Sequence, residues 1–226
     1  MSIFRNHRIP CPSCGTPMEY ELVHSVNVDR RPDLRDSILD GGFQLQECPS
    51  CGTASRCEPE FTYMDQSRHQ FIAVWPASKR HVWKDCAERS RATFDAMLGK
   101  DATREARAIG ETLDVRTVFG WPALVEKLLA RGAGIDDRTL EAAKLAVMRT
   151  QPESPLPGTV ELRMISVEDG APVLAWLGDH DDSRPALKVP RSLLDEIDAH
   201  PEKWQPVRQC VGEGDVVDFQ RGMLAS

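Results

Sequence analysis

The feature that most constrains this chain is a repeated pentapeptide. Cys-Pro-Ser-Cys-Gly occurs at residues 11–15 and again, identical in all five positions, at residues 48–52. Two cysteines separated by two residues can place both sulfur atoms on one metal ion in a tight turn. The proline fixes the backbone after the first cysteine, and the glycine can take the left-handed conformation that closes the turn. Each copy therefore has the chemistry of a metal knuckle.

The two copies together offer four thiolates, from Cys11, Cys14, Cys48 and Cys51. Structural zinc is coordinated tetrahedrally, and four cysteine ligands leave no position for water or substrate. We therefore predict one structural zinc ion held by these four residues. Iron is an alternative occupant, because four thiolates also bind an iron centre of the rubredoxin type.

The 33 residues between Cys14 and Cys48 exceed the roughly 15 to 20 of a simple zinc ribbon, so further structure must lie between the knuckles. Apolar and polar residues alternate over residues 18–28, which predicts a half-buried strand. Residues 32–40 indicate a short helix that ends at two glycines, and residues 43–47 alternate again. We expect a zinc-ribbon-like β module with an inserted short helix, in which the returning chain brings the knuckles together.

The other cysteines and the strand histidine are not predicted to be ligands. The chain has seven cysteines, an odd number, and no signal peptide is apparent, so a disulfide framework is not expected. Cys57 and Cys86 follow the spacing of apolar neighbours and are predicted to be small core residues, whereas Cys210 stands alone. His24 is in phase with the apolar residues of its strand and is predicted to be a strand histidine whose hydrogen bonds are satisfied.

Thiol–disulfide exchange is the rival interpretation of a Cys-x-x-Cys motif. In thioredoxin-like proteins the motif lies at a helix N-terminus, whose dipole lowers the pKa of the thiol. Neither copy here precedes a helical pattern, because Cys14 is followed by a strand pattern and Cys51 by a polar loop. The sequence favours metal binding over redox chemistry.

Composition narrows the classes of partner. The formal net charge is -7, and nonspecific nucleic-acid binding requires clustered Lys and Arg, so nucleic acid is not the expected partner. No apolar run approaches the roughly 18 to 20 residues of a membrane helix. The first residues also lack the apolar stretch of a signal peptide. We expect a soluble, cytoplasmic protein.

Helical patterns follow the predicted β module. A strand is expected at residues 71–75 and a helix at residues 82–98, with Gly99 after it. The core stripe of this helix is predicted to be Trp83, Cys86, Ser90, Phe94 and Met97. Further helices are expected at residues 121–131 and from a cap at Asp136 or Asp137.

The helical pattern ends in the last third of the chain. Three prolines and a glycine at residues 151–158 predict a linker. Two strand patterns then flank Asp169-Gly170, which is a hairpin turn pair, and a short helix is expected at residues 190–197. The predicted fold class is α+β. The predicted domains are residues 1–80 (zinc-knuckle β module), 81–150 (helical segment packed on it) and 151–226 (linker and small C-terminal α+β segment).

Several of these motifs resemble the bacterial CpXC-domain family. The resemblance rests on two Cys-Pro-x-Cys knuckles about 35 residues apart, and on short segments between and after them. These segments are Val26-Asn-Val28, the helix at 34–39, Asp40-Gly41 and Tyr63-Met-Asp65. The match covers roughly residues 9 to 80, and segments within 116–144 look similar. The family implies metal binding at the four knuckle cysteines, has no established activity and adds no catalytic residue.

The sequence favours a binding protein over an enzyme. It contains no nucleophile motif, phosphate-binding glycine loop or dinucleotide fingerprint, and we predict no catalytic residue. The expected function is protein interaction or scaffolding around a structural zinc site, with another protein or a second copy as the partner. The alternatives are an enzyme with a pocket between the zinc module and the helices, and a thiol-redox protein. No substrate is predicted.

Overall fold

The computed structural model describes residues 1–150, 160–178 and 186–223. The chain divides into two compact units, Met1–Trp121 and Pro122–Ser226, which we call the N-terminal unit and the C-terminal unit. The three domains predicted from the sequence divide the chain at other places, and that division stays a prediction. The predicted linker at residues 151–158 lies outside the described residues.

The N-terminal unit is built on one mixed sheet of five strands in the order β1-β2-β5-β6-β7. Its strands are β1 (Ile3–Pro10), β2 (Pro17–Asn27), β5 (Phe61–Asp65), β6 (Gln70–Trp75) and β7 (Asp114–Phe119). Strands β2 and β5 pair in parallel, as do β6 and β7, while the other neighbours are antiparallel. Every residue of β6 is buried, as expected for an inner strand covered on both faces.

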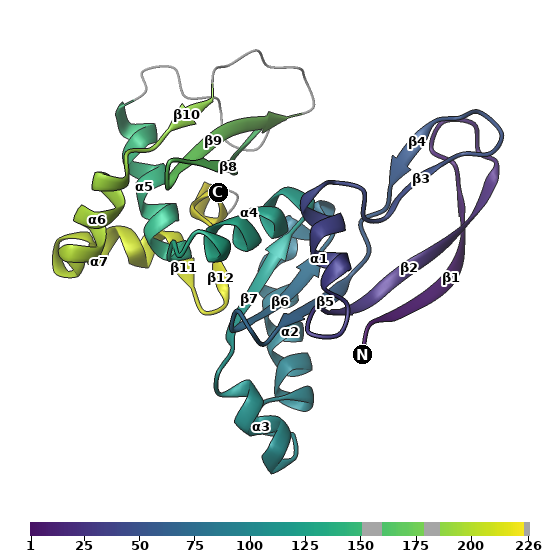
Figure 1. Ribbon diagram of the computed structural model, residues 1–226, viewed down its shortest axis with the longest axis horizontal. Helices are drawn as coiled ribbons and strands as arrows, with labels where there is room; N and C mark the ends of the chain where they lie inside the picture. The colour runs from purple at the N-terminus through teal and green to yellow at the C-terminus, as the bar shows by residue number, and fades with distance from the viewer. Residues whose placement is uncertain (151–159, 179–185, 224–226) are drawn as a thin grey trace. The chain divides into compact units, whose positions relative to one another are not determined.

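Three helices and a 3-10 segment complete this unit. They are α1 (Pro32–Leu39), η1 (Ala77–Val82), α2 (Trp83–Met97) and α3 (Arg104–Gly110). In Figure 1, α1 lies in front of the sheet and α2 behind it. The ring of Phe94 on α2 packs edge-on against Phe71 of β6, with ring centroids 5.1 Å apart, and this contact anchors the helix to the sheet.

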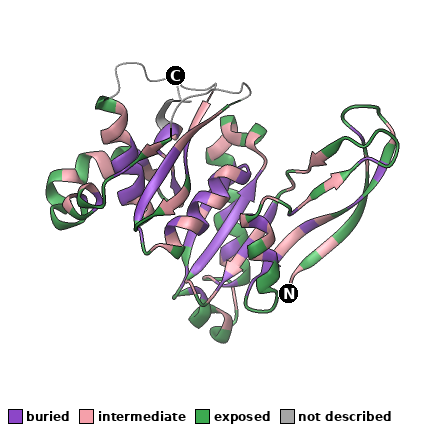
Figure 2. Cartoon of the chain, turned by 45° about the horizontal axis from the view of Figure 1, so that its top comes forward, coloured by how far each residue is buried: buried purple, intermediate pink, exposed green. Residues whose placement is uncertain are grey.

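Two short strands, β3 (Leu45–Glu47) and β4 (Ala54–Arg56), form a separate hairpin next to the β1–β2 hairpin. Figure 1 shows both hairpins extending from the rest of the unit, with their turns close together at the far end. The inner strands of the sheet are buried, whereas these hairpins are largely exposed or intermediate (Figure 2). The hairpin turns are the two Cys-Pro-Ser-Cys-Gly segments.

The C-terminal unit combines helices with small antiparallel sheets. Its helices are α4 (Trp121–Gly132, which begins at the last residue of the N-terminal unit), α5 (Asp137–Thr150), α6 (Arg191–Ala199) and α7 (Pro201–Val211). Its strands are β8 (Val160–Glu168), β9 (Ala171–Gly178), β10 (Leu187–Lys188), β11 (Gly212–Glu213) and β12 (Val216–Val217), followed by the 3-10 segment η2 (Phe219–Met223). Their apolar side chains form one core that includes Leu140, Leu162 and Leu174.

Turn and capping residues in the sequence correctly predict several of these elements. The β8–β9 hairpin turns at Asp169 and Gly170, which have φ angles of 52° and 76°, so a two-residue turn with both residues left-handed is confirmed. Helix α5 is capped by Asp136, whose Oδ1 accepts hydrogen bonds from the backbone N–H groups of Arg138 and Thr139. The α+β fold class predicted from the sequence is confirmed.

Other expectations need correction. Met97 was predicted to be a core residue of α2, but it is 47% exposed, because the helix ends at this residue. The alternation of buried and exposed residues predicted for β2 is interrupted, since Val23 is fully buried while Leu22 and His24 are only partly buried. Within the described residues, no helix combines the length and hydropathy needed to cross a membrane.

Candidate metal centre

The four predicted cysteines come together at the tips of the two hairpins. Each Sγ atom of Cys11, Cys14, Cys48 and Cys51 lies within 4.8 Å of the others. In each knuckle the first cysteine is buried and the second exposed. Among the described residues, this is the one group of three or more Cys, His, Asp and Glu side chains close enough to hold a metal ion.

Two of the sulfur–sulfur separations match the edge of a tetrahedral zinc site. The Sγ atoms of Cys11 and Cys51 are 3.8 Å apart, and those of Cys14 and Cys48 are 3.7 Å apart. Four sulfur atoms placed about 2.3 Å from a central zinc ion would be about 3.8 Å apart, since that is the edge of the tetrahedron. Both short separations join one knuckle to the other, so the cluster is a single shared site.

Backbone hydrogen bonds give the two knuckles the same shape. The N–H of Gly15 donates to the carbonyl of Cys11, and the N–H of Gly52 donates to that of Cys48, both at 2.9 Å. Gly15 and Gly52 have φ angles of 74° and 71°, a conformation that side-chain-bearing residues rarely take. The glycine at the end of each motif is thus required by the turn, as predicted.

The repeat extends one residue further than the pentapeptide, because threonine follows both glycines. The carbonyls of Thr16 and Thr53 accept from the N–H groups of Cys11 and Cys48, at 2.8 and 3.0 Å, which closes each hairpin. The hydroxyl of each threonine lies 3.3 Å from the Sγ of the second cysteine of its knuckle. The two threonines were not singled out from the sequence. The signal for them was that the repeat continues to this sixth residue in both copies.

These contacts give the thiols different pKa values. The side chain and backbone of Thr53 stabilise the thiolate of Cys51 and lower its pKa to about 6, and Thr16 lowers the pKa of Cys14 in the same way. Cys48 accepts hydrogen bonds from the backbone of Cys51 and Ser50, but burial and the neighbouring thiols outweigh them and raise its pKa to about 11. A bound cation would stabilise all four thiolates at once.

Side chains from the inserted segment hold the two hairpins against each other. The amide of Gln44 donates to the carbonyl of Glu21 and accepts from the N–H of Val23, while that of Gln46 donates to the carbonyl of Glu19. Below the cluster, Met18 and Tyr20 pack with Cys11 and Cys48 in a small apolar core. This core fixes the position of the first cysteine of each knuckle.

The remaining cysteines and His24 lie outside the sulfur cluster. Cys86 is buried between Trp75 and Phe119, as the helical stripe predicted. Cys57 is half-buried and packs beside the small core, and Cys210 is exposed. Neither knuckle begins a helix, so the setting of a thioredoxin-like motif is absent from both.

A second group of ionisable residues lies in the core of the C-terminal unit. Glu126, Glu141, Lys144 and Arg163 are between 0% and 1% exposed. The Lys144 Nζ pairs with Glu126 and, at 2.9 Å, with Glu141. The Glu126 carboxylate also binds the Arg163 guanidinium at 3.1 Å and accepts from the N–H of Met164. Each of these four charges is paired inside the core, which is the arrangement of a structural network and not of an open catalytic site.

This network was not predicted from the sequence, because charged residues are usually exposed. A signal was nevertheless present in α4, whose residues 121–130 are apolar almost all round except for Glu126 and Lys127. A helix that is apolar on all sides is buried, so its charged residues require partners.

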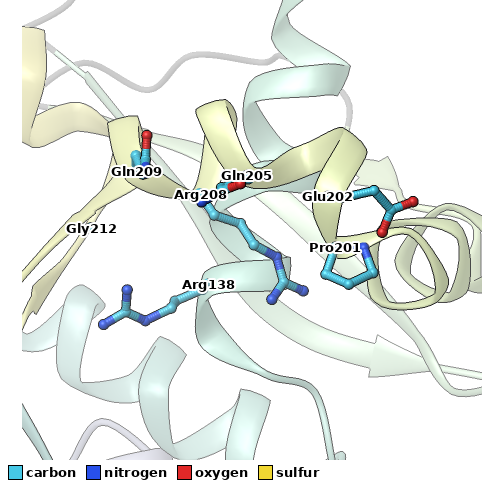
Figure 3. A pocket seen from close by; sticks show the side chains of 7 residues that line it. All are labelled: Arg138, Pro201, Glu202, Gln205, Arg208, Gln209 and Gly212. Carbon is cyan, nitrogen blue, oxygen red and sulfur yellow. The ribbon is translucent and has the colours of Figure 1, made fainter.

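A cavity of about 450 Å³ lies at the surface of the C-terminal unit, beside α7 and the start of α5. Figure 3 shows the side chains of Arg138 and Arg208 reaching into it in different directions. Arg208 already donates to Thr139 Oγ1 and Asp198 Oδ1, at 2.7 and 2.8 Å, and Arg138 contacts the carbonyl of Gly214. These arginines are engaged within the protein, so the cavity is a weaker candidate site than the cysteine cluster.

Comparison with known proteins agrees with the geometry of the cluster. Residues 9–144, more than half of the chain, match the model of a family described as CpXC protein. No curated protein and no solved structure matches the chain. The matched segment contains all four clustered cysteines and both hairpins.

Proposed function

This chain belongs to the CpXC family, and we propose that it is a metal-dependent binding protein whose N-terminal unit is held together by one structural zinc ion. Cys11, Cys14, Cys48 and Cys51 would be the ligands. The observation that carries the proposal is the pair of sulfur separations between the knuckles, 3.7 and 3.8 Å, which match the edge of a zinc–sulfur tetrahedron of about 3.8 Å.

Four thiolate ligands make the metal structural. A zinc ion that catalyses hydrolysis keeps a position for water, and a closed set of four sulfur ligands offers none. Zinc here would supply stability and would fix the shape of the two hairpins. The function would then belong to the surfaces that the ion holds in place.

The surface that the metal would shape most directly is the pair of knuckle turns. Pro12, Ser13, Pro49 and Ser50 are exposed at the tips of the hairpins. Zinc would rigidify these turns, and a rigid surface binds a partner with a smaller loss of conformational entropy than a flexible one. We propose that another protein, or a second copy of the chain, binds here.

The metal is tested by elemental analysis of full-length protein prepared without added metal. We expect about one zinc per chain, because the four sulfur atoms form one cluster. Cys51→Ser should lower the metal content, whereas Cys210→Ser, at an exposed cysteine outside the cluster, should leave it unchanged. Iron with a rubredoxin-like visible absorption would overturn the identity of the metal, and absence of both metals would overturn the site.

The interaction role is tested separately on metal-loaded protein. We expect Pro12→Asp and Pro49→Asp to keep the metal but to abolish capture of native partners, or self-association measured by light scattering. A matched change at an exposed residue of the C-terminal unit, Gln209→Asp, should have no effect. Unchanged association in both proline variants would contradict a binding role for the knuckle turns and leave the metal site intact.

A further inference from the structure

We propose that the N-terminal unit also binds a small apolar carboxylic acid in a cavity on the face of the sheet that carries α2. The cavity has a volume of about 640 Å³, within the range of roughly 300 to 1,000 Å³ that is typical of small-molecule sites. It is distinct from the cysteine cluster, since no knuckle residue lines it. The proposal does not depend on the identity of the metal.

The hollow arises from a row of small side chains across three neighbouring strands. Ser25 of β2 is paired with Thr62 of β5, which in turn is paired with Ala73 of β6, and all three line the cavity. Larger residues at these positions would fill the space beside α2. Because the row crosses the sheet at one level, its members share a face and form a continuous floor.

Apolar walls rise on both sides of this floor. Leu22 of β2 lines one side, and Trp75 together with Met97 of α2 lines the other. The indole N–H of Trp75 donates to the Ser90 hydroxyl at 2.9 Å, which locks the ring in place. Met97 is 47% exposed at the end of α2, so a flexible apolar side chain stands at the rim. An apolar ligand would therefore contact apolar side chains on two sides.

A β-bulge brings a histidine to this cavity. Ile3 and Phe4 of β1 are paired with Ser25 and Val23, so His24 is an extra residue of β2 without an opposite partner. Bulges redirect a side chain, and here both His24 and the adjacent Ser25 line the cavity. The Nε2 atom of His24 is buried and has no hydrogen-bond partner in the described structure. The sequence-based prediction that the hydrogen bonds of His24 are satisfied is therefore wrong for this atom.

Two imidazoles at the cavity suit an anionic head group, because each can donate a hydrogen bond to it. His7 also lines it, with its ring centroid 5.8 Å from that of His24. The one carboxylate in the lining, Glu60, is already paired with Arg89 at 3.3 Å. A ligand carboxylate would thus meet two imidazoles, and it would give the buried Nε2 a charge-assisted hydrogen bond.

The test is a titration of zinc-loaded, full-length protein with octanoate, with 1-octanol as the uncharged match of equal chain length. We expect saturable binding of octanoate, with chemical-shift changes that centre on His24, Thr62 and Ala73. His24→Leu should weaken octanoate binding about tenfold, because a hydrogen bond to a charged group is lost, and should leave octanol binding unchanged. Equal affinity for octanoate and octanol in the parent protein would overturn the carboxylate assignment.

The location is tested by filling the cavity. Thr62→Phe should abolish octanoate binding, whereas Glu21→Phe, at an exposed residue of β2 outside the cavity, should not. Met97→Glu provides a second test at an exposed position, since a carboxylate at the rim would repel the ligand and should weaken binding severalfold. Metal content of each variant reports that the unit is folded. Full binding by metal-loaded Thr62→Phe and Met97→Glu would overturn the proposed site.

Discussion

Both units of this protein bury groups that can carry a negative charge, but the surroundings of these groups differ. In the N-terminal unit, two of the four clustered cysteines are buried, and the sulfur atoms face one another with no cationic side chain in the cluster. In the C-terminal unit, each buried carboxylate of the network lies against Lys144 or another cation of the same unit. The first arrangement can hold an ion from solution, and the second has its countercharges within the chain.

Because of this difference, we expect the two units to respond to different perturbations. Removal of metal should act on the sulfur cluster, since thiolates brought this close repel each other without a cation. Loss of one cation from the network should act on the C-terminal unit, because a buried carboxylate would be left without its partner.

The largest effect should follow removal of the metal. Structural zinc contributes on the order of 10 kcal/mol in small zinc-folded domains. We expect a strong chelator, or Cys48→Ser, to abolish hydrogen-exchange protection in β1 to β4 while α5 and β8 stay protected. Equal loss of protection in α5 would contradict a different response of the two units. Cys210→Ser serves as the control.

A smaller but still large effect should follow Lys144→Met. This change removes the cation that Glu126 and Glu141 share, and breaking a buried pair costs about 3–5 kcal/mol. We expect the C-terminal unit to unfold at a much lower urea concentration, with the metal content unchanged. Lys203→Met breaks an exposed pair with Glu196 and should shift the midpoint little. Loss of metal from Lys144→Met would mean that the units are not independent.

The order in which the thiols react tests the difference in pKa between Cys51 and Cys48 in the metal-free cluster. Because the pKa of Cys51 is lowered to about 6 and that of Cys48 is raised to about 11, iodoacetamide should label Cys51 well before Cys48 at pH 7. Labelling of Cys51 should slow as the pH falls through about 6. Thr53→Val should slow it at pH 7, whereas Thr93→Val, outside the cluster, should not. Equal rates for the two cysteines would contradict the asymmetry.

The smallest effect concerns pH and the C-terminal unit. Burial, with repulsion from Glu126, outweighs Lys144 and raises the pKa of Glu141 from 4.5 to about 7. Between these values the folded unit keeps a proton that the unfolded chain has released, so its stability should fall as the pH rises from about 4.5 to about 7. We expect Glu141→Gln to flatten this dependence in urea unfolding curves, and Glu202→Gln to leave it unchanged. If stability still falls with rising pH in Glu141→Gln, another group causes the pH dependence.

The parts of the fold that the sequence predicts are those set by neighbouring residues. The knuckles, α1 with its terminal glycines, and the Asp169-Gly170 hairpin depend on turn and capping residues within a few positions. The sulfur cluster was predicted from the repeat, and its closure was inferred from the returning chain. Its metal remains a prediction.

The parts that were missed depend on contacts between distant segments. The parallel pairing of β6 with β7 joins residues more than 40 positions apart, and no local pattern specifies it. The bulge at His24 shifts the alternation of β2 by one residue, so a strict period of two misplaces the residues after it. Buried charges such as Glu126 look like surface residues until their partners are known.

The buried network also bears on how fragments of this protein should be designed. The segment that matches the family ends at Lys144, within α5, whereas Arg163 and Asp218, which pair 2.7 Å apart, lie well beyond it. A fragment that stops at residue 144 would keep Glu126 and lose the guanidinium that binds it. Such a fragment would expose a face that the intact chain covers, and aggregation during its purification would reflect the position of the cut. The boundary of a family, drawn from similarity along the sequence, need not coincide with the boundary of a stable fragment.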